Sequence, residues 1–228
     1  GLARGQAKLF GAGVAIGAAA LLVVAGLMAV PGWLTFRTDT GNFTGWALTL
    51  LHDFGLLGIA AAAEEAIFRG YAFQALARGL GALPAIAAGS IIFAWAHSAN
   101  PNVGAMAFAN IFLAGVMLSA AFLLTRSLWY ATAIHVGWNW AMASLADLPV
   151  SGLEIMDTPL YEPTVDGPAW FTGGAFGPEG GLAGTIAFGL ALAAVWRFTR
   201  NQGPLARAAA AAKLETDPAD TENTSRIG

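Results

Sequence analysis

The sequence predicts an all-α protein, a polytopic transmembrane bundle of about six helices with a polar site near the middle of the membrane. Of its 228 residues, 57% are hydrophobic and 11% are charged, whereas soluble domains average about 25% charged residues. Mean hydropathy over the chain is +0.61. The apolar residues also gather into segments close to the roughly 20 residues that cross a bilayer as one helix.

Six such segments follow one another along the chain. The first is long enough to span by itself, so we interpret it as a span and not as a cleaved signal. The third is short, and the stretch 43–53 before the second is expected to be either an interfacial helix or the start of a longer, tilted span. In chain order the predicted spans are Leu9–Val30, Phe54–Ala77, Ala82–His97, Val103–Leu124, Leu128–Ala146 and Gly181–Trp196.

The domain organisation and orientation follow from these spans. The bundle is expected at residues 1–204, with 205–228 forming a cytoplasmic helix (205–215) and a disordered tail. Lys and Arg cluster in the loops on one side, whereas the loop 147–180 has six acidic residues and neither Lys nor Arg. Only Arg37 lies on the opposite side. By the positive-inside rule, we expect both termini in the cytoplasm. The expected location of this multi-pass protein is the plasma membrane.

Composition also excludes several functions. The chain has no cysteine, which rules out disulfides, zinc–thiolate sites and cysteine catalysis. No basic patch with interleaved aromatic residues is present, so no nucleic-acid partner is expected. The expected partners are the lipid bilayer and a membrane-associated peptide or protein substrate.

Polar residues within the predicted spans are the strongest functional signal, because each is costly in lipid and usually faces the bundle interior. A spacing of four places Glu65 and Arg69 on one helical face, where they can pair. The same spacing stacks His135 above Asn139. The full set is Glu64, Glu65, Arg69, His97, Asn110, His135 and Asn139.

Counting depth predicts that three of these residues share one site. At about 1.5 Å per residue, Glu64 lies roughly 15 Å below the outer boundary if the second span starts at Phe54. His97 and His135 lie roughly 20 Å and 10 Å above the inner boundary. A second span that started at Gly45 would instead place the glutamates at the inner surface, away from His97.

These side chains are suited to hydrolysing an acyl bond. A carboxylate in an apolar pocket, here Glu64, can act as general base, with His97 orienting a water. His135 and Asn139 can supply donors for a developing oxyanion. Glu64, His97 and His135 could equally hold Zn²⁺ with a water in the open position. The residues alone leave both mechanisms open.

Structural roles also account for some of these residues. Glu65 and Arg69 alone would more often be an ion pair, and one histidine in a span can serve as a helix–helix hydrogen bond. Asn110 and Asp53 are interpreted as structural, and Phe93 as packing beside the site.

Three motifs together resemble the CPBP family, which comprises CAAX proteases and bacteriocin-processing enzymes and includes the type II prenyl endopeptidases. They are "EEAIFRG" (64–70), "FAWAH" (93–97) and "HVGWN" (135–139), which match Glu-Glu-x-x-x-Arg, Phe-x-x-x-His and His-x-x-x-Asn. The resemblance covers about residues 55–145. Relatives commonly have one or two more spans, and the loop 147–180 belongs to no family motif.

The resemblance implies an intramembrane endopeptidase acting on a membrane-associated substrate, either prenylated (CAAX-type) or signal- or bacteriocin-like. It implies Glu64 as base with His97, and His135 with Asn139 as oxyanion or ligand pair. Glu65, Arg69 and Phe93 would support them. We favour a mechanism without a cofactor, because no tight pattern such as His-Glu-x-x-His occurs. One divalent metal ion, zinc, held by Glu64, His97 and His135 is the alternative.

Two other functions use the same residues. One is a proton-coupled transporter with Glu64, His97 and His135 as a relay, which the absence of an internal repeat disfavours. The other is a non-catalytic immunity protein that binds peptides in the same groove.

Overall fold

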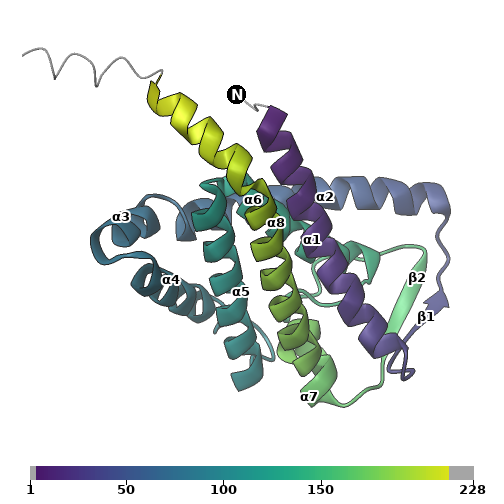
Figure 1. The fold of residues 1–228 in the computed structure, drawn as a ribbon. Coiled ribbons are helices and arrows are strands. Elements are labelled where there is room, and N and C mark those ends of the chain that lie inside the picture. The colour runs from purple at the N-terminus through teal and green to yellow at the C-terminus, as the bar shows by residue number, and fades with distance from the viewer. Residues whose placement is uncertain (1–3, 216–228) are drawn as a thin grey trace, which may run out of the picture.

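The computed structural model describes residues 4–215 and confirms the predicted helical fold (Figure 1). A two-stranded sheet and several short helical turns accompany the long helices. The longer elements are α1 (Arg4–Ala29), β1 (Leu34–Thr38), α2 (Phe43–Phe68), α3 (Tyr71–Leu80), α4 (Ala82–Ala96), α5 (Ala105–Thr125), α6 (Leu128–Trp140), β2 (Tyr161–Val165) and α8 (Leu182–Glu215). The short ones are the π-helix η1 (Ala141–Leu145), α7 (Ala169–Thr172), and the 3₁₀ turns η2 (Gly174–Phe176) and η3 (Pro178–Gly180).

The chain is a multi-pass membrane protein, but the predicted count of about six spans is not confirmed. Within residues 4–215, four helical stretches are long and apolar enough to cross a bilayer. Two predicted spans fall short of that length, since α4 has 15 residues and the α-helical part of the fifth span, α6, has 13. The four stretches are Gln6–Ala29, Phe43–Leu80, Ala105–Thr125 and Leu182–Asn201.

The second span differs most from its prediction. Its helix begins at Phe43, where the side chain of Asn42 caps it by accepting from the N–H of Gly45 at 2.9 Å, and it continues unbroken past Phe54. It ends at Phe68, and the chain turns sharply at Gly70, where a Cβ would collide with the carbonyl oxygen of Ala66. The predicted start at Phe54 is therefore wrong, and α3 is a separate helix.

The direction of α2 also differs from that of a simple span. Figure 1 shows α2 running across the direction of α1, α5 and α8. The first residues of α1 and the described end of α8 lie at the same end of the bundle. Residues 182–215 form one continuous helix across the predicted boundary at 204, and the predicted tail 216–228 lies outside the described residues.

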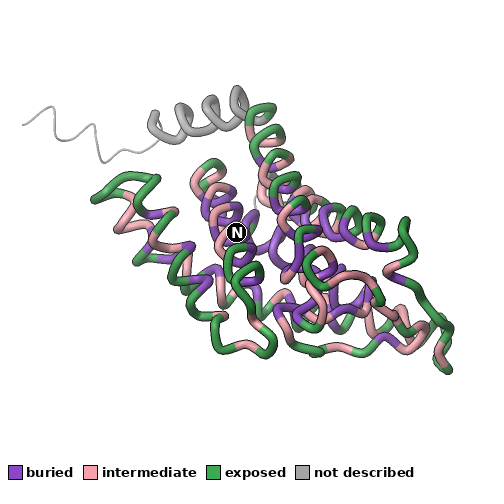
Figure 2. The backbone as a smooth tube through the Cα atoms, turned by 90° about the horizontal axis from the view of Figure 1, so that it is seen from below, coloured by how far each residue is buried: buried purple, intermediate pink, exposed green. Residues whose placement is uncertain are grey.

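The most buried element is α6, whose residues from Tyr130 to Trp138 are all buried. It packs most extensively on α1 and also contacts α2 and α5. The contact with α1 is close because glycines face it: a Cβ at Gly17 would collide with the carbonyl oxygen of Ile134, and one at Gly137 with that of Val14. Figure 2 shows buried residues on the inner faces of the helices and exposed residues on the outer ones. The helix that carries two motif residues is thus held rigidly.

The segment 147–180 is folded against the bundle. Its strand β2 pairs antiparallel with β1, with Leu34 opposite Val165 and Thr38 opposite Tyr161. The amide of Asn110 on α5 donates to the carbonyl oxygens of Glu179 and Gly181 at 2.8 and 2.9 Å. This agrees with the structural role expected of Asn110, and it places the end of the segment beside the helices.

Candidate active site

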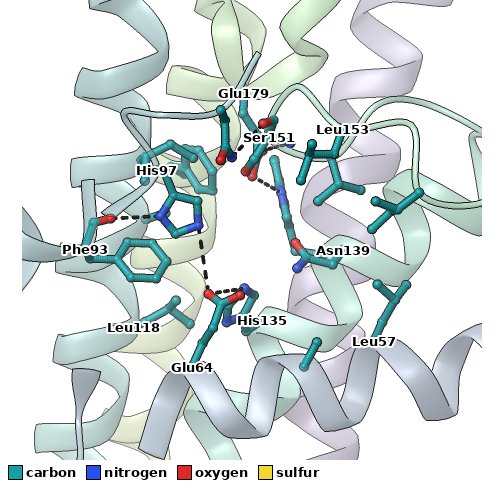
Figure 3. A pocket seen from close by; sticks show the side chains of 18 of the residues that line it. Leu57, Glu64, Phe93, His97, Leu118, His135, Asn139, Ser151, Leu153 and Glu179 are labelled. Carbon is teal, nitrogen blue, oxygen red and sulfur yellow. Dashed lines mark hydrogen bonds and ion pairs between the residues drawn. The ribbon is translucent and has the colours of Figure 1, made fainter. Parts of the chain in front are cut away.

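The three motifs meet at one pocket of about 130 Å³. Glu64 comes from α2, His97 from the C-terminal cap of α4, and His135 and Asn139 from α6. Figure 3 shows Glu64 pointing towards both histidines, with Ser151 and Glu179 across the pocket. The remaining wall is largely apolar and includes Leu57, Ile111, Met117, Leu118, Leu153, Ile155 and Phe188.

Glu64 directs one carboxylate oxygen at two imidazoles. Its Oε2 lies 3.9 Å from Nε2 of His97 and 3.9 Å from Nε2 of His135. This oxygen is buried and has no hydrogen-bond partner among the described residues. A buried polar atom without a partner is uncommon and needs an explanation, such as a bound water or a catalytic role. The oxygen and the two nitrogens thus surround a gap wider than a direct hydrogen bond.

His97 is held through its other ring nitrogen. Nδ1 lies 2.8 Å from the carbonyl oxygen of Phe93, and because a carbonyl can only accept, Nδ1 carries the proton. In the neutral ring, Nε2 is then free to accept on the Glu64 side. The Phe93 ring also packs on the imidazole, with 4.6 Å between ring centroids. Phe93 therefore positions His97 by both its backbone and its ring.

His135 is held by a buried chain of ionic contacts. Its Nδ1 lies 3.0 Å from Oε1 of Glu65, and the same oxygen accepts from the Arg69 guanidinium at 3.0 Å. Arg69 also donates to the carbonyl oxygen of Gly115 at 3.1 Å, which ties the chain to α5. Both Glu65 and Arg69 are fully buried. The predicted Glu65–Arg69 pair is present, and its link to His135 is an addition that the sequence did not reveal.

The predicted co-location of Glu64, His97 and His135 is found, although the depth argument behind it fails. That argument required the second span to start at Phe54, whereas α2 starts at Phe43. Since α2 runs across the other helices (Figure 1), residue number along it does not measure depth. Asn139 lies one helical turn beyond His135 and lines the same pocket.

The side-chain types suit zinc, and their spacing is wider than that of ligands around a bound ion. Ligand atoms of one tetrahedral Zn²⁺ lie about 3.4 Å apart, given bonds of about 2.1 Å, whereas both carboxylate–imidazole separations are 3.9 Å. Within the described part of the chain, only Asp147, Asp157 and Glu162 bring three ligand atoms within 4.8 Å of one another. These three residues do not line the pocket. Glu64, His97 and His135 do not bring three ligand atoms within 4.8 Å of one another.

Sequence reasoning missed the residues that the segment 147–180 contributes. Glu179 is buried, and its Oε1 accepts from the indole N–H of Trp138 at 2.9 Å. Its Oε2 accepts from the N–H and the hydroxyl of Ser151, at 2.8 and 2.7 Å. The available signal was a single carboxylate between Pro178 and Gly180, two residues before the sixth predicted span.

The comparison with protein families agrees with the resemblance drawn from the motifs. Residues 46–141 match a family described as "Type II CAAX prenyl endopeptidase Rce1-like". The matched range contains Glu64, Glu65, Arg69, Phe93, His97, His135 and Asn139. No curated protein and no solved structure was found to match the chain.

Proposed function

We propose that this chain, which carries an Rce1-like domain at residues 46–141, hydrolyses a peptide bond of a membrane-associated substrate with water activated by Glu64 and His97. The domain supports a membrane-embedded CAAX-type protease. The observation that carries the finer proposal is the gap bounded by Glu64 Oε2 and the two Nε2 atoms, each 3.9 Å from it. A water held there would contact the base and both imidazoles.

The chemical steps use water and side chains alone. Glu64 takes a proton from the water, while Nε2 of His97 accepts a hydrogen bond that orients it. The resulting hydroxide attacks the carbonyl carbon, and the carbonyl oxygen becomes an oxyanion. Glu64 then returns its proton to the amide nitrogen as the C–N bond breaks, which yields a carboxylic acid and an amine.

The oxyanion needs hydrogen-bond donors within reach of the reacting carbon. The side-chain amide of Asn139 can donate, and Nε2 of His135 can donate when the ring is protonated. Glu65 accepts from Nδ1 of His135 at 3.0 Å and so fixes the ring's orientation. Arg69 in turn donates to Glu65 and holds the carboxylate in place. In this proposal Glu65 and Arg69 are positioning residues.

The pocket and the membrane support a substrate class. The walls are mostly apolar, which suits a peptide with apolar side chains such as a prenylated CAAX-type end or a signal- or bacteriocin-like segment. The Lys and Arg bias supports cytoplasmic termini, and the plasma membrane is the location that we propose. The described ends of α1 and α8 at one end of the bundle (Figure 1) are compatible with that orientation.

Peptide cleavage by the purified, reconstituted protein tests the proposal. Glu64→Gln and His97→Ala should each lower the cleavage rate more than about 100-fold, the usual contribution of a general base or its partner. The matched control is Glu162→Gln, which changes an exposed carboxylate outside the pocket and should leave the rate within about twofold. Cleavage that survives Glu64→Gln would refute Glu64 as the base.

The same samples distinguish a metal mechanism. Treatment with a chelator, followed by metal analysis, should leave the cleavage rate unchanged. A loss of cleavage that added zinc restores would contradict the metal-free mechanism while keeping the site.

A further inference from the structure

Residues 153–157 form an extended stretch, and two of its side chains line the pocket. Leu153 and Ile155 line the pocket, with 41% and 44% of their surface exposed. Met156, between Ile155 and Asp157, packs instead against the hydrophobic core. Glu154 and Asp157 are exposed. In an extended chain residues two apart point to the same side, which is consistent with Leu153 and Ile155 both facing the pocket.

The backbone of this stretch is unpaired beyond its first residue. Leu153 exchanges two hydrogen bonds with Val150, each of 2.9 Å, and the chain runs without a turn or bend from residue 154 to residue 158. Within residues 4–215, no protein group hydrogen-bonds to the backbone of residues 154–157. Such a free edge is able to accept another strand.

We propose that this edge, residues 153–157, binds an extended segment of the peptide substrate as an added β-strand, with Leu153 and Ile155 contacting its apolar side chains. The proposal rests on the proposed function and extends it to how the substrate is held. The edge borders the same pocket as Glu64 and His97. A peptide paired with the edge would therefore lie beside the pocket that contains the reacting groups. Strand addition is a common way for proteins to hold an extended peptide, since main-chain bonds give affinity and alternate side chains give specificity.

The turn before this edge, at Ser151 and Gly152, is held by hydrogen bonds in the absence of a peptide. Glu179 accepts two hydrogen bonds from Ser151, and the amide of Asn100 donates to the Ser151 carbonyl oxygen at 2.8 Å. The N–H of Gly152 donates to the carbonyl oxygen of Phe176 at 2.8 Å. A preorganised edge loses little conformational entropy when a peptide pairs with it.

Strand geometry identifies which backbone groups would meet the peptide. In a strand, the N–H and C=O of successive residues point to opposite sides. Since both groups of Leu153 point to Val150, those of Glu154 and Met156 should point to the free side, and those of Asp157 away from it. Glu154 and Asp157 therefore form a matched pair, because both are exposed acidic residues on opposite backbone registers.

Peptide binding measured without turnover tests this proposal. We would place Glu154→Pro and Asp157→Pro separately in the Glu64→Gln background and titrate each in nanodiscs with a fluorescent farnesylated peptide that ends in Cys-Ala-Ala-X. Glu154→Pro removes a free-edge N–H and should raise Kd about 3- to 10-fold, the effect of one backbone hydrogen bond. Asp157→Pro should change Kd less than twofold. Glu154→Gln and Asp157→Asn control for the lost charge.

A second experiment removes the backbone hydrogen bonds by changing the peptide instead of the protein. Replacing single amides of the peptide with esters should weaken binding at alternate positions only. Three results would each overturn strand addition. They are equal effects of the two proline variants, ester effects without a period of two, and no binding of the parent peptide. Cleavage by the wild-type protein is measured separately, so a failure of the proposed hydrolysis is distinguishable from a failure of this binding mode.

Discussion

The buried pair of Glu65 and Arg69 gives the most quantitative prediction. Arg69 donates to Glu65, to the Gly115 carbonyl oxygen at 3.1 Å, and to the Ser119 hydroxyl at 3.5 Å. With 0% and 1% of their surfaces exposed, neither charge can be solvated if the other is removed. Breaking a buried pair by removing one partner costs about 3–5 kcal/mol. Arg69→Met should therefore lower the free energy of unfolding by about that amount.

For a chain of this size, 1 kcal/mol corresponds to about 2–4 °C in Tm. Arg69→Met should accordingly lower Tm by about 6–20 °C, measured in detergent by intrinsic tryptophan fluorescence. Glu65→Gln leaves Arg69 unpaired and should also destabilise the protein. The double variant removes both charges and should be more stable than the sum of the single effects predicts, by at least about 1 kcal/mol.

Two results would refute this reasoning. A Tm decrease of less than about 3 °C in Arg69→Met would mean that the pair is not buried as described. Single effects that add to within about 0.5 kcal/mol in the double variant would mean that the two charges do not interact.

Two further predictions concern the segment 147–180. Burial raises the pKa of Asp147 to about 6, with Glu162 and Asp157 adding to the increase and the bond from the N–H of Thr158 opposing it. The folded protein thus binds the proton more tightly than the unfolded chain, so stability falls as pH rises from about 4 to 6. Asp147→Asn should raise Tm above about pH 6 but not at pH 4, and a gain independent of pH would contradict this. Glu179→Ala leaves three buried donors unpaired and should cost at least about 3 kcal/mol, at about 1 kcal/mol or more for each donor, measured by thermal unfolding. Glu179→Gln should cost less than half of that, and equal losses would show that the carboxylate oxygens are not the acceptors.

The residues of the candidate site could be predicted because the signals that mark them lie within single helices. Glu65 and Arg69 pair within one helix, so a spacing of four residues was sufficient to place them together. The cost of burying Glu64, His97 and His135 in apolar segments then marked each of them as a site residue. The contact between His135 and Glu65 joins residues 70 positions apart, and no local rule indicates that α6 packs there on α2.

The course of α2 and the contribution of the segment 147–180 could not be predicted, because both depend on contacts between residues far apart in the sequence. Apolar periodicity identifies a helix but not its direction, so the depth count assumed a span perpendicular to the membrane. Glu179 contacts Trp138 and Ser151 across 41 and 28 residues, and its segment belongs to none of the three motifs. Only the tertiary arrangement brings that carboxylate to the pocket wall.

The central claim is that Glu64 and His97 act on one water. A double-mutant cycle of peptide cleavage by reconstituted protein tests it most directly, with Glu64→Gln, His97→Ala and the double variant. Groups that act as a unit are strongly non-additive, so the double variant should be no more than about tenfold slower than Glu64→Gln alone. A double variant slower by the product of the two single effects would contradict a shared water.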